Sequence, residues 1–324
     1  MDSWRVRAPR PPALVHPAPI DPAGESGPTR GQACGPRWRR TSTGLYVGSQ
    51  VDRTLVEQRI LEESGRLPAG GAVGGWAALR LHGVGYLDGL AADGQALLPV
   101  PLVVPPGTPL RSVDGVVVHR NPLPRDDRAV RHGVPVTAPA RSAFDAARWA
   151  GDWRGAVVAL DLALAAGVVA RPALTRYVAE QRGRPGARAV TRALALTDDR
   201  SMSPKETALR LIWVLDAGLP RPRCNWPVAD EDGNLIGRPD LLSEEHAVVG
   251  EFDGAQHRSR SRHRDDLRRD DAFRAVGLEP FRVVGADLDD VPLVLARIGA
   301  AIARTETSNV PRTWRLRANP RPVA

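Results

Sequence analysis

The sequence has almost no lysine and almost no cysteine. Among its 324 residues Lys205 is the only lysine, and the two cysteines, Cys34 and Cys224, lie far apart. Thiols so few and so distant suggest neither a disulfide framework nor a cysteine-ligated metal site. Any chemistry that depends on a lysine amine has a single candidate in this chain.

Long apolar runs are missing as well. No stretch reaches the roughly 18 apolar residues that a membrane-spanning helix needs. The first residues contain no apolar core of the signal-peptide type. We therefore expect a soluble, cytoplasmic protein with no membrane contact. Apolar residues still make up 42% of the chain, which is enough to bury sizeable cores, and the length suits about two domains.

Positive charge is in excess. Lysine and arginine number 45 against 37 acidic residues, which gives a net charge of +8, and the pI is about 10.6. This balance favours a polyanionic partner, with DNA as the first expectation. An arginine-rich genome composition would give the same totals, so the charge alone does not identify the partner.

Composition divides the chain into five parts. Residues 1–40 are rich in Pro, Gly and Arg and predict a disordered tail. Residues 41–182 mix short helical and strand patterns and predict an amino-terminal α/β domain. Residues 183–202 predict a linker, residues 203–304 a second domain, and residues 305–324 a flexible tail.

The second predicted domain has a regular order of elements. Its first helix begins with Ser203 as N-cap, Pro204 in the first turn and Glu206 three residues after the cap. The following strands and helices complete the order α-β-β-β-α-β-α, at residues 224–230, 235–242, 247–253, 258–277, 280–285 and 289–304. The predicted fold class of the chain is therefore mixed α/β.

Acidic residues lie at the ends of two of these strands. Asp240 follows Pro239, and "AVVGEFDGAQH" places Glu251 and Asp253 two residues apart, hence on one face of a strand. A hairpin of the two strands would set Asp240 opposite Glu251 or Asp253. Such carboxylates repel one another unless a cation lies among them, and oxygen ligands suit Mg²⁺ or Mn²⁺. A divalent ion beside a basic surface suits phosphodiester hydrolysis.

The stretch "GRPDLL…VVGEFDGAQH" resembles the motif of the PD-(D/E)xK nucleases. Further matching pieces are His257, Asp266 with Arg269, and Gly277 before "FRVV". The likeness is closest to very-short-patch-repair-like endonuclease domains of the DUF559 type in actinobacterial two-domain proteins, and it covers about residues 203–304. It implies a restriction-endonuclease-like fold and a Mg²⁺-dependent DNA endonuclease.

The resemblance implies a role for each matching position. Asp240 and Glu251 would bind Mg²⁺ or Mn²⁺, and Glu206 would match an acid of the first helix. Asp253 stands where the superfamily often has a lysine, so that Gln256, His257 or Lys205 would take over this function near the attacking water. The residues that would grip DNA phosphates are Arg258, Arg260, Arg262, Arg264 and Arg269.

Most of these residues also have a structural interpretation. Glu206 fits a capping box, His257 fits a surface position, and Asp253 with Gly254 fits a turn. The arginines and aspartates after residue 257 fit a solvated helix held by salt bridges. Asp240 and Glu251 are harder to explain in this way, because both follow apolar strand residues and both match the motif.

Residues 50–182 resemble the AbiEi-type antitoxins, through phrases such as "PVTAPAR". Those proteins pair a small winged-helix DNA-binding unit with a mixed α/β domain. The resemblance implies a reduced DNA-binding or docking helix pair at residues 50–85 and a protein partner for the amino-terminal domain. The alternative function is therefore a non-catalytic DNA-binding regulator of antitoxin type on a degenerate nuclease scaffold. A third is an interaction protein whose charge is incidental.

Overall fold

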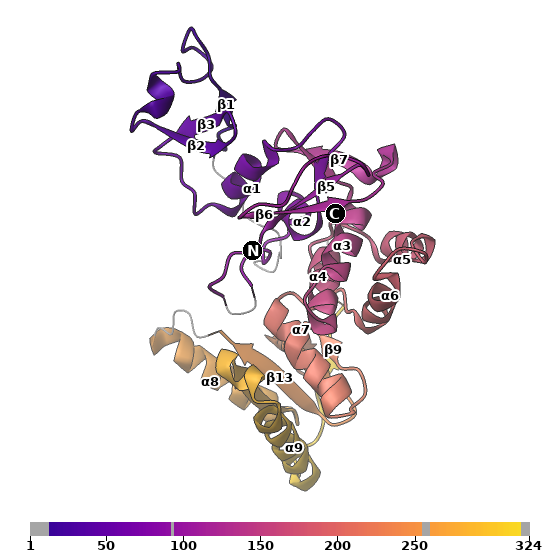
Figure 1. Cartoon of the computed structure of the whole chain (residues 1–324). Coiled ribbons are helices and arrows are strands. Elements are labelled where there is room, and N and C mark those ends of the chain that lie inside the picture. The colour runs from indigo at the N-terminus through magenta and orange to yellow at the C-terminus, as the bar shows by residue number, and fades with distance from the viewer. Residues whose placement is uncertain (1–12, 92–93, 255–259, 319–324) are drawn as a thin grey trace. The chain divides into compact units, whose positions relative to one another are not determined.

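The computed structural model describes residues 13–91, 94–254 and 260–318, and for residues 260–266 it describes the backbone only. The chain forms two compact units, Met1–Leu196 and Thr197–Ala324 (Figure 1). Each unit contains both helices and sheets. The predicted mixed α/β class is therefore confirmed.

The first unit begins with a small antiparallel sheet, where the sequence predicted a disordered tail up to residue 40. The strands lie in the order β1-β3-β2, and the elements are β1 (Ala18–Pro19), η1 (Gln32–Cys34), β2 (Trp38–Ser42) and β3 (Leu45–Gly48). Polar contacts stabilise this part of the chain. The Asp21 carboxylate accepts backbone hydrogen bonds from Ala23 and Ser26, and Arg39 forms an ion pair with Glu62 at 2.7 Å.

A five-stranded sheet of order β6-β5-β4-β8-β7 forms the centre of the first unit. Its strands are β4 (Ala72–Val73), β5 (Val100–Val104), β6 (Val116–Arg120), β7 (Arg128–Arg131) and β8 (Val134–Thr137). The helices α1 (Val56–Ser64) and α2 (Gly75–Leu81) share its core, because Ile60 and Ala77 are buried in one cluster with Val136. The helix pair predicted at residues 50–85 is thus built into the sheet domain.

Four more helices complete the first unit: α3 (Pro139–Arg148), α4 (Trp153–Ala165), α5 (Arg171–Glu180) and α6 (Ala187–Leu196). Helix α6 lies where the sequence predicted a linker over residues 183–202. It buries Ala187, Val190 and Ala193, which recur about once per turn. The stripe consists of small residues, and this explains why a search for large apolar residues missed the helix.

A four-stranded sheet of order β14-β13-β12-β9 forms the centre of the second unit. Its strands are β9 (Arg223–Cys224), β12 (Leu241–Ser243), β13 (Val248–Asp253) and β14 (Glu279–Val284). Strands β12 and β13 pair antiparallel, as the predicted hairpin requires, and β13 pairs parallel with β14. The sheet therefore brings the residues before β12 close to the end of β13.

Two predicted strands of the second unit are each interrupted. The strand at 224–230 divides into β9 and β10 (Val228–Ala229), because Asn225 adopts a left-handed backbone with φ of 50° and Pro227 follows. The strand at 235–242 divides into β11 (Leu235–Gly237) and β12 around Pro239. Strands β10 and β11 join β15 (Arg315–Leu316) in a separate small sheet, so the predicted flexible tail at 305–324 also contains ordered structure.

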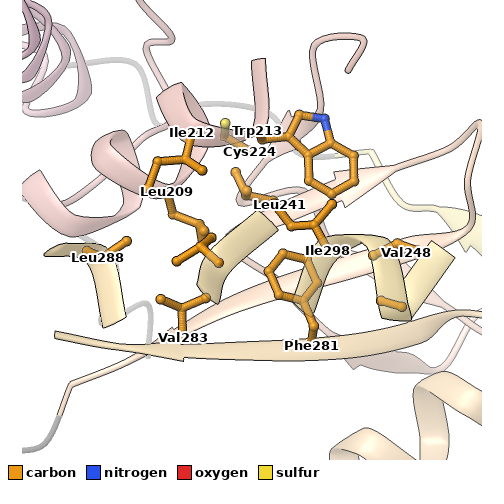
Figure 2. Close-up of a cluster of buried hydrophobic side chains, with 12 residues drawn as sticks. Leu209, Ile212, Trp213, Cys224, Leu241, Val248, Phe281, Val283, Leu288 and Ile298 are labelled. Carbon is orange, nitrogen blue, oxygen red and sulfur yellow. The ribbon is translucent and has the colours of Figure 1, made fainter. Parts of the chain in front are cut away.

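Helices cover both faces of the second sheet. Helix α7 (Pro204–Leu211), its continuation η3 (Ile212–Asp216) and α9 (Val291–Thr307) pack on one face, where Leu209, Trp213 and Ile298 meet Phe281 (Figure 2). Helix α8 (Arg260–Ala275) packs on the other face through Phe273. Successive strand residues alternate between the two cores: Val248 faces α7 and α9, and Val249 faces α8. By the same alternation, Glu251 belongs to the α8 face.

Candidate functional site

Three acidic side chains from separate elements gather in the second unit. Glu206 lies in the first turn of α7, Asp240 just before β12, and Glu251 on β13. The pairing of Leu241 with Gly250 places Asp240 and Glu251 next to the same rung of the hairpin. Burial raises the pKa of Asp240, and the negative charges of Glu206 and Glu251 raise it further. The fold therefore brings together three of the acids that the sequence singled out.

Glu206 is held by hydrogen bonds at the start of α7. Its own N–H donates to Ser203 Oγ at 3.1 Å, and its Oε2 accepts from Met202 N at 2.8 Å. This agrees with the predicted capping role of the first turn. Oε2 also accepts a hydrogen bond from Asn225 Nδ2 at 2.7 Å. Burial raises the pKa of Glu206, and these hydrogen bonds offset part of the rise.

Asp240 is buried close to other charged groups. Burial raises its pKa well above the ordinary carboxyl value, and the Glu206 charge raises it further. Its Oδ2 accepts a hydrogen bond from Phe252 N at 2.7 Å, so one carboxylate oxygen holds the end of β13. Its main-chain carbonyl accepts from Asn225 N at 3.2 Å.

Glu251 is paired with arginine. Its Oε2 lies 2.9 Å from Arg282 Nη2, and its Oε1 lies 3.5 Å from Arg269 Nη1. Burial raises the pKa of Glu251, while the Arg282 charge and then the Arg269 charge lower it in part. Arg282 also contacts Asp270 at 2.8 Å. The protein thus places the positive charge of Arg282 against Glu251, a carboxylate that the sequence predicted to bind a metal ion.

Sequence reasoning missed two residues of this site. Arg282 is the parallel-strand partner of Glu251, which no motif indicated. Asn225 connects Glu206 to the chain next to Asp240, and only 6% of it is exposed. The only sequence signal for Asn225 is that asparagine tolerates the left-handed conformation better than most residues.

The remaining predicted site residues are described only in part. Asp253 ends β13 and is half-buried. Gln256, His257 and Arg258 lie outside the described residues, as do the side chains of Arg260, Arg262 and Arg264 on α8. Within the described part of the chain, no group of three or more His, Cys, Asp and Glu side chains has an arrangement that could hold a metal ion.

A different charge cluster lies in the first unit. Arg141 on α3 is fully buried and pairs with Asp127 at 2.8 Å and Asp145 at 2.7 Å. Tyr177 of α5 donates a hydrogen bond to Asp127 at 3.0 Å, and Arg148 pairs with Asp145 at 2.7 Å. This cluster joins α3 and α5 to η2 (Arg125–Asp127), next to the sheet.

Comparison with known proteins finds a family match for most of the first unit. Residues 72–198 match the family model of the AbiEi antitoxin C-terminal domain. Two uncharacterized proteins of Mycobacterium tuberculosis, from strains CDC 1551 and H37Rv, are each 32% identical to the chain over 200 residues, which is 61% of this chain and 71% of each relative.

The chain belongs to the family of these two mycobacterial proteins. The predicted AbiEi resemblance is confirmed over residues 72–198, the five-stranded sheet and helices α2 to α6. The nuclease resemblance concerns residues outside this range and stays a prediction. No solved structure matches the chain significantly. Among the described residues, no helix is both long and apolar enough to span a bilayer.

Proposed function

We propose that the chain is a DNA-binding regulator of the antitoxin type, whose second unit keeps a nuclease-like arrangement without cutting DNA. The match of residues 72–198 to the AbiEi antitoxin C-terminal domain carries this proposal. The net charge of +8 supports a nucleic-acid partner in the cytoplasm. By the same likeness, the first unit would also contact a protein partner.

The contacts of Glu251 support the non-catalytic part of the proposal. A metal-binding carboxylate needs its oxygens directed to the ion. Here Oε2 of Glu251 contacts Arg282, whose position in the neighbouring strand is fixed by the sheet register. Asp240 has one oxygen bound to the Phe252 N–H. Glu251 thus ties β13 to β14, and Asp240 ties the residue before β12 to β13.

Binding and cleavage measured on one preparation test this proposal. We expect the full chain to shift a fluorescent DNA duplex at low salt, with an affinity that falls as salt is added. We also expect plasmid DNA to stay intact with Mg²⁺ or Mn²⁺ present. Cleavage that disappears in Glu251→Ala would contradict the non-catalytic assignment. Glu231→Ala, which removes an exposed acid of the same unit, is the matched control.

A second candidate is the Mg²⁺-dependent endonuclease, and one observation favours it. Burial raises the pKa of Asp240, and the charges of two neighbouring acids, Glu206 and Glu251, raise it further. A divalent cation would relieve this repulsion. Asp240 and Glu251 would hold the ion, since Mg²⁺ often takes only one or two protein carboxylates and keeps several waters. The ion would supply charge stabilisation and a more acidic bound water.

In this second candidate the other predicted residues keep their proposed roles. Asp253, Gln256 and His257 would orient the attacking water, with Lys205 and Glu206 as further candidates near the site. The five arginines Arg258, Arg260, Arg262, Arg264 and Arg269 would hold the phosphates. Calorimetric titration with Mn²⁺ separates the two candidates without relying on cleavage. Heat of binding in wild type that is lost in Asp240→Asn would favour the nuclease.

A further inference from the structure

Helices α5 and α6 and the loop between them carry an excess of positive charge. Residues 171–196 contain six arginines and one acid, Glu180, which gives a local net charge of +5. No acidic residue occurs from residue 181 to residue 197. This segment therefore lacks local charge neutralisation.

Four arginines of this segment form what we call the α6 basic surface: Arg182, Arg184, Arg188 and Arg192. Arg188 and Arg192 are exposed and stand four residues apart, hence on one face of α6. The opposite face buries Val190 and Ala193. Arg182 and Arg184 lie in the loop that leads into the first turn, where the positive end of the helix dipole adds to their charge.

These arginines differ from those of α8, which the sequence predicted as phosphate ligands. In the described part of α8, Arg274 pairs with Asp271 and Glu279, and Arg269 pairs with Glu251. None of the four arginines of the α6 basic surface forms an ion pair with an acid among the residues that the structure describes. Arg182, Arg188 and Arg192 are also exposed, so their charge is available to a ligand.

The helices that carry the α6 basic surface are held in place by packing within the first unit. Helix α6 packs against α4 and α3, and α5 is tied to the buried Arg141 cluster through the Tyr177–Asp127 hydrogen bond. The backbone positions of the four arginines are therefore set before any ligand binds. A preformed surface loses less conformational entropy on binding than a flexible tail of the same charge.

We propose that the α6 basic surface binds the phosphate backbone of duplex DNA. This inference rests on the proposed DNA-binding function and assigns that function to a surface. A rise of 1.5 Å per residue separates Arg188 from Arg192 by about 6 Å along the helix, and duplex DNA offers about one negative charge per 1.7 Å of its axis. Contacts of this kind bind without reading the base sequence.

The salt dependence of binding gives the sharpest test. Each phosphate contact contributes about 0.9 to the slope of log affinity against log salt concentration. We expect the triple variant Arg182→Gln, Arg188→Gln, Arg192→Gln to lower this slope by up to about 2.7 and to weaken binding to a short mixed-sequence duplex at least tenfold. Arg184 is left in place because it lies near Tyr177.

A matched control removes the same charge elsewhere in the first unit. Arg53, Arg111 and Arg125 are also exposed, and their triple change to Gln should alter the affinity less than about threefold. Equal losses in both variants, or no loss in the first, would overturn the assignment to α6. A wild-type chain that binds no duplex at low salt would overturn the proposed function itself. Binding to anionic lipid vesicles in place of DNA would overturn both.

Discussion

The two units bury charge in opposite ways. In the first unit, the cation Arg141 lies between two acids, Asp127 and Asp145, so that opposite charges face each other. In the second unit, Asp240 is buried close to two further acids, Glu206 and Glu251, of which Glu251 pairs with Arg282 and Arg269. Burial raises the pKa of all three acids. A cluster in which opposite charges are paired is accounted for by a structural role, which here is to connect α3 and α5. An excess of buried like charge is unfavourable for folding and is typical of a functional site or of the remains of one.

The largest expected effect is the loss of the balanced cluster. Arg141→Ala would leave Asp127 buried without its cation and Asp145 with Arg148 as its remaining arginine, and we expect the free energy of unfolding to fall by about 3 to 5 kcal/mol. Urea denaturation of the full chain measures this loss. Arg125→Ala removes an exposed arginine nearby and should change stability by less than about 0.5 kcal/mol. A cost for Arg141→Ala below about 1 kcal/mol would show that the cluster contributes little.

A smaller effect is expected for the arginine of the second unit. Arg282→Gln would remove the main counter-charge of Glu251, and we expect a loss of about 1 to 2 kcal/mol at pH 8, reduced because the arginine is 26% exposed. The pKa of Glu251 would rise further without this cation. The loss should therefore shrink toward pH 4, where Glu251 takes up a proton. A loss that is independent of pH would assign the effect to packing alone.

The smallest effect has the opposite sign. Asp240→Asn keeps an oxygen that accepts the Phe252 N–H and removes a buried charge. The folded-state pKa of Asp240 is raised, so its protonated form contributes stability below the ordinary carboxyl pKa, and this stability is lost as pH rises through the raised value. The variant should be more stable than wild type by about 1 kcal/mol at pH 8 and equally stable near pH 4.

Thermal unfolding of both proteins across this pH range checks the third prediction. The difference between variant and wild type is the informative quantity, because other acids titrate equally in both. A variant that is less stable at pH 8 would mean that Asp240 is needed in its charged form. That outcome would strengthen the metal-binding candidate. It would also mean that the buried charges of both units stabilise the fold, so that Asp240 would not differ from the Arg141 cluster in this respect.

Local signals predicted much of the second unit. Ser203 and Glu206 form the first turn of α7 as the capping pattern indicated. The hairpin of β12 and β13 follows from two apolar runs separated by a short polar turn, and its register puts Asp240 close to Glu251. These features depend on residues close together in sequence, and for such residues spacing and composition are sufficient to predict the local structure.

The missed features depend on distant partners or on small side chains. Arg282 reaches Glu251 because β14 returns parallel to β13 after α8, a register that no local pattern specifies. Asn225, at the break between β9 and β10, has a side-chain partner distant in sequence, Glu206. Helix α6 relies on alanine and valine, and β2 of the first sheet is tied to α1 by the ion pair of Arg39 with the distant Glu62.

The small sheet of the second unit has a practical consequence for anyone who expresses that unit separately. Strand β15 comes after α9 and pairs with β10, while Trp314 and Leu316 pack on the core beneath α8. A protein trimmed at residue 304, where the sequence places the domain end, would lose β15 and would uncover part of the core that contains Phe273 and Val276. The segment through Leu316 therefore belongs to the minimal foldable piece.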